Sequence, residues 1–101
     1  MVIIRQVLQH LSNDDIQHAL TNYIGKTTKY LIVTEDLPST DQFIANIDKP
    51  TGVGIRLKLG SGVDLEQQPF SMPFKSSTNL LSINVLAEGM DSRVVTKIYE
   101  L

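Results

Sequence analysis

The chain has 101 residues, a formal net charge of −2, and contents of 42% hydrophobic and 20% charged residues. These values are typical of one soluble globular domain and exclude a disordered chain. The slight negative charge and the lack of a basic stripe give no reason to expect a nucleic acid partner. The absence of cysteine excludes disulfides and thiolate metal sites. No apolar run reaches the roughly 20 residues that span a membrane, so we expect no membrane partner and a cytoplasmic protein.

The chain opens with a predicted strand. Val2, Ile3 and Ile4 form a continuous β-branched run, which is typical of a strand buried on both faces, as in a parallel sheet. Because Met1 directly precedes this run, the sequence is expected to begin inside a strand.

A capped amphipathic helix is predicted after this strand. Ser12 is expected to be the N-cap, with Asp15 at the third helical position as an S-x-x-D variant of the capping box and Leu11 packing on Ile16. Gly25 is expected to end the helix. The predicted buried stripe is Ile16, Ala19, Leu20, Tyr23 and Ile24.

A second buried strand is predicted at Tyr30–Val33, and Thr34–Pro38 is expected to end it. A strand, a helix and a second strand form a right-handed βαβ unit, so the two strands should be parallel. From there to about Ser77 no helical stripe persists, and an irregular connection of this length, ~40 residues, is often a functional lid. Within it, the alternating stretch Ile55–Leu59 predicts a half-exposed strand or an extended lid segment.

The last part of the chain predicts an antiparallel hairpin. Leu80–Leu86 and Val94–Tyr99 are strand-like runs, and residues 87–92 between them supply turn chemistry. In the first run, Leu81, Ile83 and Val85 share one face.

Candidate site residues follow from the predicted parallel strands. In open α/β sheets the ligand crevice lies outside the carboxyl ends of such strands, which selects Arg5, Gln6 and His10 after the first strand and Thr34, Glu35 and Asp36 after the second. A histidine titrates near neutral pH, so His10 is a candidate general base; alternatively it packs beside the helix and bonds the backbone. An ion pair between Arg5 and Glu35 or Asp36 is the alternative to ligand contacts there. His18 lies on the polar helix face and is expected to be solvated. The histidines and carboxylates show no metal-ligand spacing, so no metal site is predicted.

The chain resembles the C-terminal half of a class I S-adenosylmethionine-dependent methyltransferase. The segment Arg5–Asn13, with its V-L-Q-H-L run, is similar to the stretch after the fourth strand of that family. Weaker similarities are Tyr30–Thr34, Pro50–Arg56 and Gln68–Pro73. The resemblance implies an α/β fold with a partial Rossmann-like methyltransferase sheet, made of a βαβ unit, an irregular lid segment and a terminal antiparallel β-hairpin.

The resemblance also implies roles for individual residues. His10 would be catalytic, Arg5 and Gln6 would contact the cofactor S-adenosylmethionine, and Glu35, Asp36, Asp48 and Arg56 would bind the acceptor substrate. The family often has an acidic residue where Gln6 stands, and for Asp48 and Arg56 an exposed loop charge is the alternative interpretation. The family's glycine-rich turn after its first strand has no counterpart here. The cofactor half is therefore expected to be absent, and this chain alone is not expected to bind the cofactor.

Two hypotheses of function follow. In the first, the chain is the acceptor-side half of a methyltransferase that acts on an unknown small molecule. In the second, it is a non-catalytic α/β domain that works through protein association. In either case Val2–Arg5 would form an unpaired apolar edge, which predicts self-association or pairing with a chain that supplies the missing N-terminal half.

Overall fold

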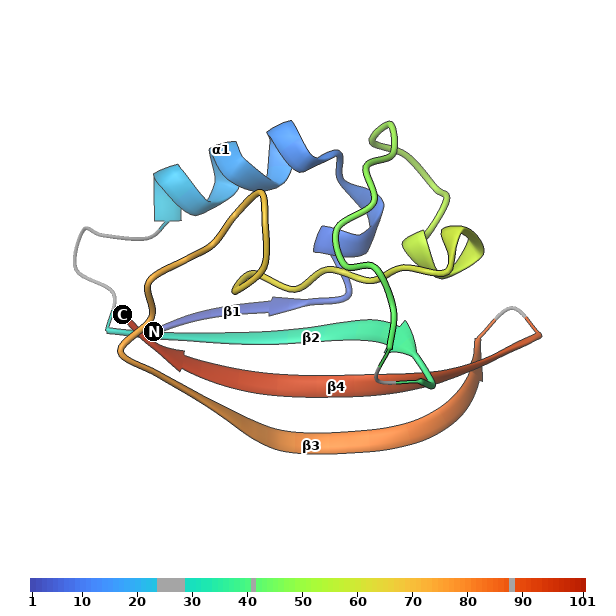
Figure 1. Cartoon of the computed structure of the whole chain (residues 1–101). Helices are drawn as coiled ribbons and strands as arrows, with labels where there is room; N and C mark the ends of the chain where they lie inside the picture. The colour runs from blue at the N-terminus through green and yellow to red at the C-terminus, as the bar shows by residue number, and fades with distance from the viewer. Residues whose placement is uncertain (24–28, 41, 88) are drawn as a thin grey trace.

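A four-stranded sheet with helices on one side makes a mixed α/β fold in the computed structural model, which describes residues 1–23, 29–40, 42–87 and 89–101 (Figure 1). The elements are, in chain order, β1 (Val2–Arg5), η1 (Leu8–His10), α1 (Asn13–Tyr23), β2 (Tyr30–Pro38), η2 (Arg56–Leu59), β3 (Ser76–Ala87) and β4 (Met90–Glu100). Among these described helices, none is long and apolar enough to cross a membrane.

The predicted parallel pair is confirmed, because β1 lies parallel to β2 with Ile4 opposite Val33. The second strand runs further than expected, through Thr34 to Pro38. The reason is tertiary: β4 pairs antiparallel with β2 along this whole length, so that Pro38 lies opposite Ser92.

The predicted hairpin is also confirmed, with both strands longer than the apolar runs that indicated them. The strand order is β1-β2-β4-β3, so the last strand lies between β2 and β3. A register shift between Asn79 and Leu81 marks an irregularity in β3. The sheet is therefore parallel at the β1 edge and antiparallel at the β3 edge.

At the start of α1, one of the two hydrogen bonds of the expected capping box is formed. The Ser12 Oγ accepts the Asp15 backbone N–H at 3.1 Å, as an N-cap does. The reciprocal bond is replaced, because the Ser12 N–H donates to the Thr51 hydroxyl at 2.8 Å and that hydroxyl donates to the Asp15 carboxylate. Ile24 and Gly25, with which we expected the helix to end, lie outside the described residues.

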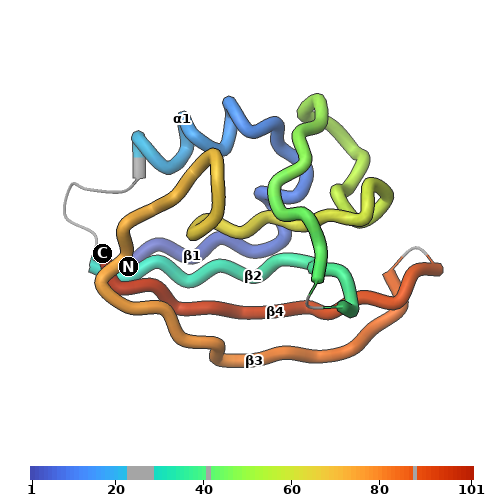
Figure 2. The backbone as a smooth tube through the Cα atoms, viewed as in Figure 1, coloured from blue at the N-terminus to red at the C-terminus, as the bar shows by residue number. Residues whose placement is uncertain are grey.

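One face of the sheet is covered by α1 together with the irregular segment 39–75, which lie on the same side of it (Figures 1 and 2). The buried core between these layers consists of Leu8, Ile16, Leu20, Leu31, Val33, Val63, Leu65, Phe70 and Tyr99. The irregular segment thus contributes three core residues and is part of the domain's second layer.

The prediction of a strand at Ile55–Leu59 was wrong. Residues Arg56–Leu59 form the 3-10 helix η2, which ends at Gly60 in the left-handed region at φ 68°. The apolar alternation reflects burial of Ile55 and Leu57 against the core side, and no strand lies beside this stretch to pair with it in the described topology.

The other face of the sheet, which we call the open face, carries no layer from the described residues (Figure 2). Cross-strand neighbours there include Ile3, Ile32 and Ile98, and further along Ile83 and Val94. Ile3 is 66% exposed, and Leu81 and Ile83 are about half exposed. The prediction that β1 is buried on both faces was therefore wrong for this chain, because β1 is an outer strand with only one face covered.

Candidate functional site

The end of β1 and the residues Thr34–Asp36 of β2 form the edge at which we predicted the site, although β2 itself continues to Pro38. Gln6 follows β1 with a positive φ of 52°, a strained value for a residue with a side chain. Its backbone N–H donates to the Thr34 carbonyl at 2.7 Å, and its Nε2 donates to the Asp36 carboxylate at 3.2 Å. The structure therefore brings Gln6 and Asp36 together. Arg5 is exposed, and the expected ion pair from Arg5 to Glu35 or Asp36 is not formed within the described residues.

Glu35 lies inside the domain and is only 3% exposed. Its carboxyl accepts the backbone N–H groups of Leu8 at 3.0 Å and Gln9 at 3.3 Å. Burial raises the pKa of this carboxyl to about 8, although the two backbone bonds act in the opposite direction. Glu35 is thus a buried acid at the site edge and its contacts are with the protein's own backbone.

The turn η1 carries the V-L-Q-H-L run across this edge. The His10 ring Nδ1 lies 3.3 Å from the Gly54 carbonyl. Its backbone carbonyl accepts the Lys49 ammonium at 3.0 Å and the Gly52 N–H at 2.9 Å. These contacts match the packing alternative for His10, while the half-buried ring still lies next to the site edge. Its catalytic role stays a prediction.

Gln9 is a residue that sequence reasoning missed. It is 95% buried, since only 5% of its surface is exposed, and its side-chain Oε1 has no hydrogen-bond partner among the described residues. An unpaired buried acceptor costs folding free energy, so Gln9 is a candidate for a contact with a ligand or water. Only the V-L-Q-H-L run could have indicated Gln9, because a single glutamine has no other pattern.

Arg56 and Asp48 hold the irregular segment to the rest of the domain. Arg56 is 1% exposed, and its guanidinium donates to the Ile47 and Leu11 carbonyls, both at 2.7 Å. Burial lowers the pKa of Arg56. The interpretation of Arg56 as an exposed loop charge was therefore wrong, because its side chain is buried and bridges the carbonyls of Ile47 and Leu11.

Asp48 is exposed, as the loop interpretation expected. Its Oδ1 accepts the N–H of Asn13 at 2.8 Å and that of Lys49 at 2.9 Å. The bond from Asn13 is the main cause that lowers the pKa of Asp48. Asp48 thus ties the first residue of α1 to the irregular segment. The predicted roles of Asp48 and Arg56 in acceptor binding stay predictions, and both side chains already have structural partners.

An apolar groove of about 330 Å³ lies between β1 and α1. It is lined by Val2, Ile3, Ile4, Arg5, Val7, Leu8, Leu11 and Ala19. The groove lies directly beside the outer strand, whose far edge pairs with no strand of the part of the chain that the structure describes. Val7 and Ile3 are both exposed there. An unpaired strand edge next to an apolar groove is a surface suited to another strand.

Metal binding has no support in the part of the chain that the structure describes. Within those residues, no three histidine or acidic side chains come together in a way that could hold a metal ion. His18 is exposed on α1, as expected.

No protein-family model, curated protein or solved structure matches this chain. The geometry described above is therefore the basis on which a function can be argued.

Proposed function

We propose that this chain is the acceptor-side half of an S-adenosylmethionine-dependent methyltransferase that acts on a small-molecule acceptor. The observation that carries the proposal is the sheet: a parallel pair with β1 as its unpaired outer strand, followed by an antiparallel hairpin at the other edge. That arrangement suits one half of a Rossmann-like methyltransferase sheet, in which Val2–Arg5 would be a central strand.

The site edge supports the same proposal. The middle of the V-L-Q-H-L run forms η1 two residues after β1, and the Gln9 N–H donates to the Glu35 carboxyl within β2. In this proposal His10 acts as the general base for the acceptor. Gln6 and Asp36, which are bonded to each other, lie where the cofactor half and the acceptor would meet. Arg5 is exposed at the same edge and free to turn toward a ligand.

The cofactor must be bound largely by polypeptide outside these 101 residues. The family's glycine-rich turn allows close approach of the backbone to the ligand. In these residues, Gly62, whose missing side chain permits close contact with Leu37, lies in the irregular segment and opens no βαβ unit. A strand that adds to the edge of β1 would bring the cofactor half to this place.

A second function, a non-catalytic domain that works through protein association, is favoured by one observation. The outer strand, the apolar groove and the open face together expose the apolar residues Ile3, Val7 and Ile83. Exposed apolar patches of this kind mark interaction sites. In the first function the bound partner supplies cofactor binding; in the second it only forms an assembly with this chain.

The test completes the sheet and measures cofactor binding. The half of a class I methyltransferase that carries the glycine-rich turn is fused before Val2, and S-adenosylmethionine binding is measured by isothermal titration for the fusion, that half alone and the 101-residue chain alone. We expect a low-micromolar dissociation constant, about −8 kcal/mol, for the fusion only. A fusion that folds but does not bind the cofactor contradicts the proposal and favours the association function.

The role of His10 is tested in the same fusion. Methyl transfer from labelled S-adenosylmethionine to a panel of small-molecule acceptors is compared for His10→Ala and for His18→Ala, the exposed histidine of α1. Loss of a general base lowers rates by about 10²–10⁴-fold, so His10→Ala should show that loss with an unchanged free energy of unfolding. Equal rates for the two variants would assign His10 to packing.

A further inference from the structure

The turn η1 begins without a cap of its own. The residue at its N-cap position is Val7, whose side chain cannot accept a hydrogen bond, and no side-chain cap bond is made from there. The first N–H groups of any helical turn lack partners within the turn. Here the N–H groups of Leu8 and Gln9 donate to the carboxyl of Glu35, which lies 27 and 26 residues further along the chain. A carboxyl on β2 therefore caps a turn that follows β1.

Three consecutive residues of β2, Thr34–Asp36, hold Gln6 and the start of η1. Thr34 accepts the Gln6 N–H through its carbonyl, and Asp36 accepts the Gln6 side chain. Glu35, between them, holds the start of η1. The position of Gln9 beside β2 therefore depends on these bonds, whereas His10 is also held by contacts with Lys49 and with residues 52 and 54. Among the three residues of β2, Glu35 is the one whose side chain accepts two backbone N–H groups.

We propose that Glu35 is the positioning residue of the site, and that gain or loss of a proton on its carboxyl loosens or tightens the turn Leu8–His10. An ionised carboxylate accepts at both oxygens, so it can hold both N–H groups fully. The neutral acid carries a proton on one oxygen and holds the turn less well. An effect of Glu35 on His10 as a base rests on the proposed function, whereas the effect on the turn Leu8–His10 does not.

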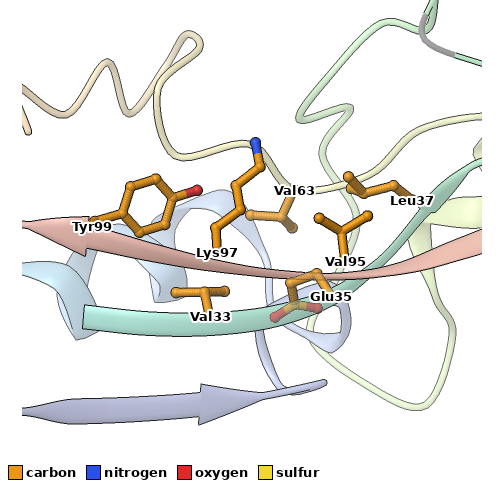
Figure 3. A pocket seen from close by; sticks show the side chains of 7 residues that line it. All are labelled: Val33, Glu35, Leu37, Val63, Val95, Lys97 and Tyr99. Atoms are coloured by element: carbon orange, nitrogen blue, oxygen red, sulfur yellow. The ribbon is translucent and has the colours of Figure 1, made fainter. Parts of the chain in front are cut away.

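The groups around Glu35 determine the pH at which its carboxyl ionises. Burial opposes ionisation and raises the pKa to about 8; the negative charge of Asp36 adds to this, and the positive charge of Arg56 opposes it. From β4, Lys97 and Tyr99 line the same small cavity of about 10 Å³, which has room for one water molecule (Figure 3). Figure 3 shows the Lys97 amine directed away from the Glu35 carboxyl. The turn should therefore tighten as pH rises through 8.

The experiment follows the turn by NMR in the 101-residue chain without cofactor or partner, so that its outcome does not depend on methyl transfer. The backbone ¹⁵N shifts of Leu8 and Gln9 and the ¹³C shift of the Glu35 carboxyl are measured between about pH 5 and 10. We expect all three to titrate with one shared midpoint near 8. Separate midpoints, or no titration of the two amides, would overturn the proposal.

Two variants assign the titration to one carboxyl. Glu35→Gln keeps the shape and one acceptor oxygen but cannot ionise, so the shifts of Leu8 and Gln9 should become independent of pH. Asp36→Asn, the matched control on the neighbouring residue, should keep one shared titration of the three shifts, with a lower midpoint because the Asp36 charge no longer opposes ionisation of Glu35. A titration of these amides that persists in Glu35→Gln, or disappears in Asp36→Asn, would show that another group controls the turn. The carboxyl shift of the wild-type chain decides the matter if Glu35→Gln does not fold.

Discussion

The two faces of one sheet differ sharply in what covers them. On the covered face, Leu31 and Val33 of β2 are buried beneath α1 and the irregular segment. On the open face, the alternate residues Ile32 and Thr34 are only partly buried, by their neighbours within the sheet. An antiparallel sheet with one solvated face normally alternates apolar and polar residues. On the open face of β1 and β2, Ile3 and Ile32 are followed by the polar Arg5, Thr34 and Asp36, so this face is apolar at one end and polar at the other, and no described residues form a layer over it.

The open face shows that residues apolar enough to be buried can still be exposed in this chain. The row Ile3, Ile32 and Ile98 crosses three strands of the open face without a polar residue. Such a row gains free energy when it leaves water, at roughly 25 cal/mol for each Å² of apolar surface. The covered face has already made this gain and should control folding. The open face has not made this gain, so association with another chain could still provide it.

The largest expected effect separates the two faces within one strand. Leu31→Ala removes a fully buried side chain and should lower the free energy of unfolding by about 2–5 kcal/mol. Ile32→Ala, the next residue on the open face, should cost about 1 kcal/mol, because its side chain is only partly buried. Urea unfolding of both variants measures the difference. Equal losses of unfolding free energy in the two variants would mean that the Ile32 side chain is as well covered as that of Leu31.

A second effect depends on pH and on the covered face alone. The pKa of Glu35 rises from 4.5 to about 8 on folding, so between these values the folded chain keeps a proton that the unfolded chain has released. The free energy of unfolding should therefore fall as pH rises through this window, by up to about 1.4 kcal/mol per pH unit, and level off above it. Urea unfolding at a series of pH values should show this slope in the wild type and a flatter one in Glu35→Gln. Parallel slopes for the two would exclude Glu35 as the cause.

The smallest effect on stability is expected on the open face, where association should change instead. Ile3→Lys places a charge at the unpaired edge, as natural edge strands do, and should alter the free energy of unfolding by less than about 0.5 kcal/mol. Light scattering at micromolar concentration should show self-association of the wild type that this variant reduces. Gln17→Lys, on the exposed side of α1, adds the same charge away from the edge and should leave association unchanged. A monodisperse wild-type monomer would contradict the role of this edge.

The parts of the fold that sequence determined are those with local causes. Ser12 caps a helix whose first turn lies directly after it, so a pattern of a few residues was sufficient. The hairpin was equally predictable, because two apolar runs and a turn lie next to each other in the chain, and Gly89 has the positive φ of 78° that such a turn uses. The parallel pairing of β1 with β2 was predictable for a similar reason, because a βαβ unit places its two strands in parallel, while the site predicted at their ends stays a prediction.

Only the tertiary structure decided the features that join distant residues. Pairing of β4 along β2 placed the last strand inside the sheet, and this pairing extended β2 to Pro38. Arg56 is buried where it bonds one carbonyl of the irregular segment, at Ile47, and one that precedes α1, at Leu11, although its own neighbours predicted a half-exposed strand or an extended lid segment. The carboxyl of Glu35 became the cap of a turn that starts 27 residues earlier. Local patterns record which side chains prefer burial; which buried polar group meets which partner depends on how the layers pack, because each such group must find its hydrogen bonds there.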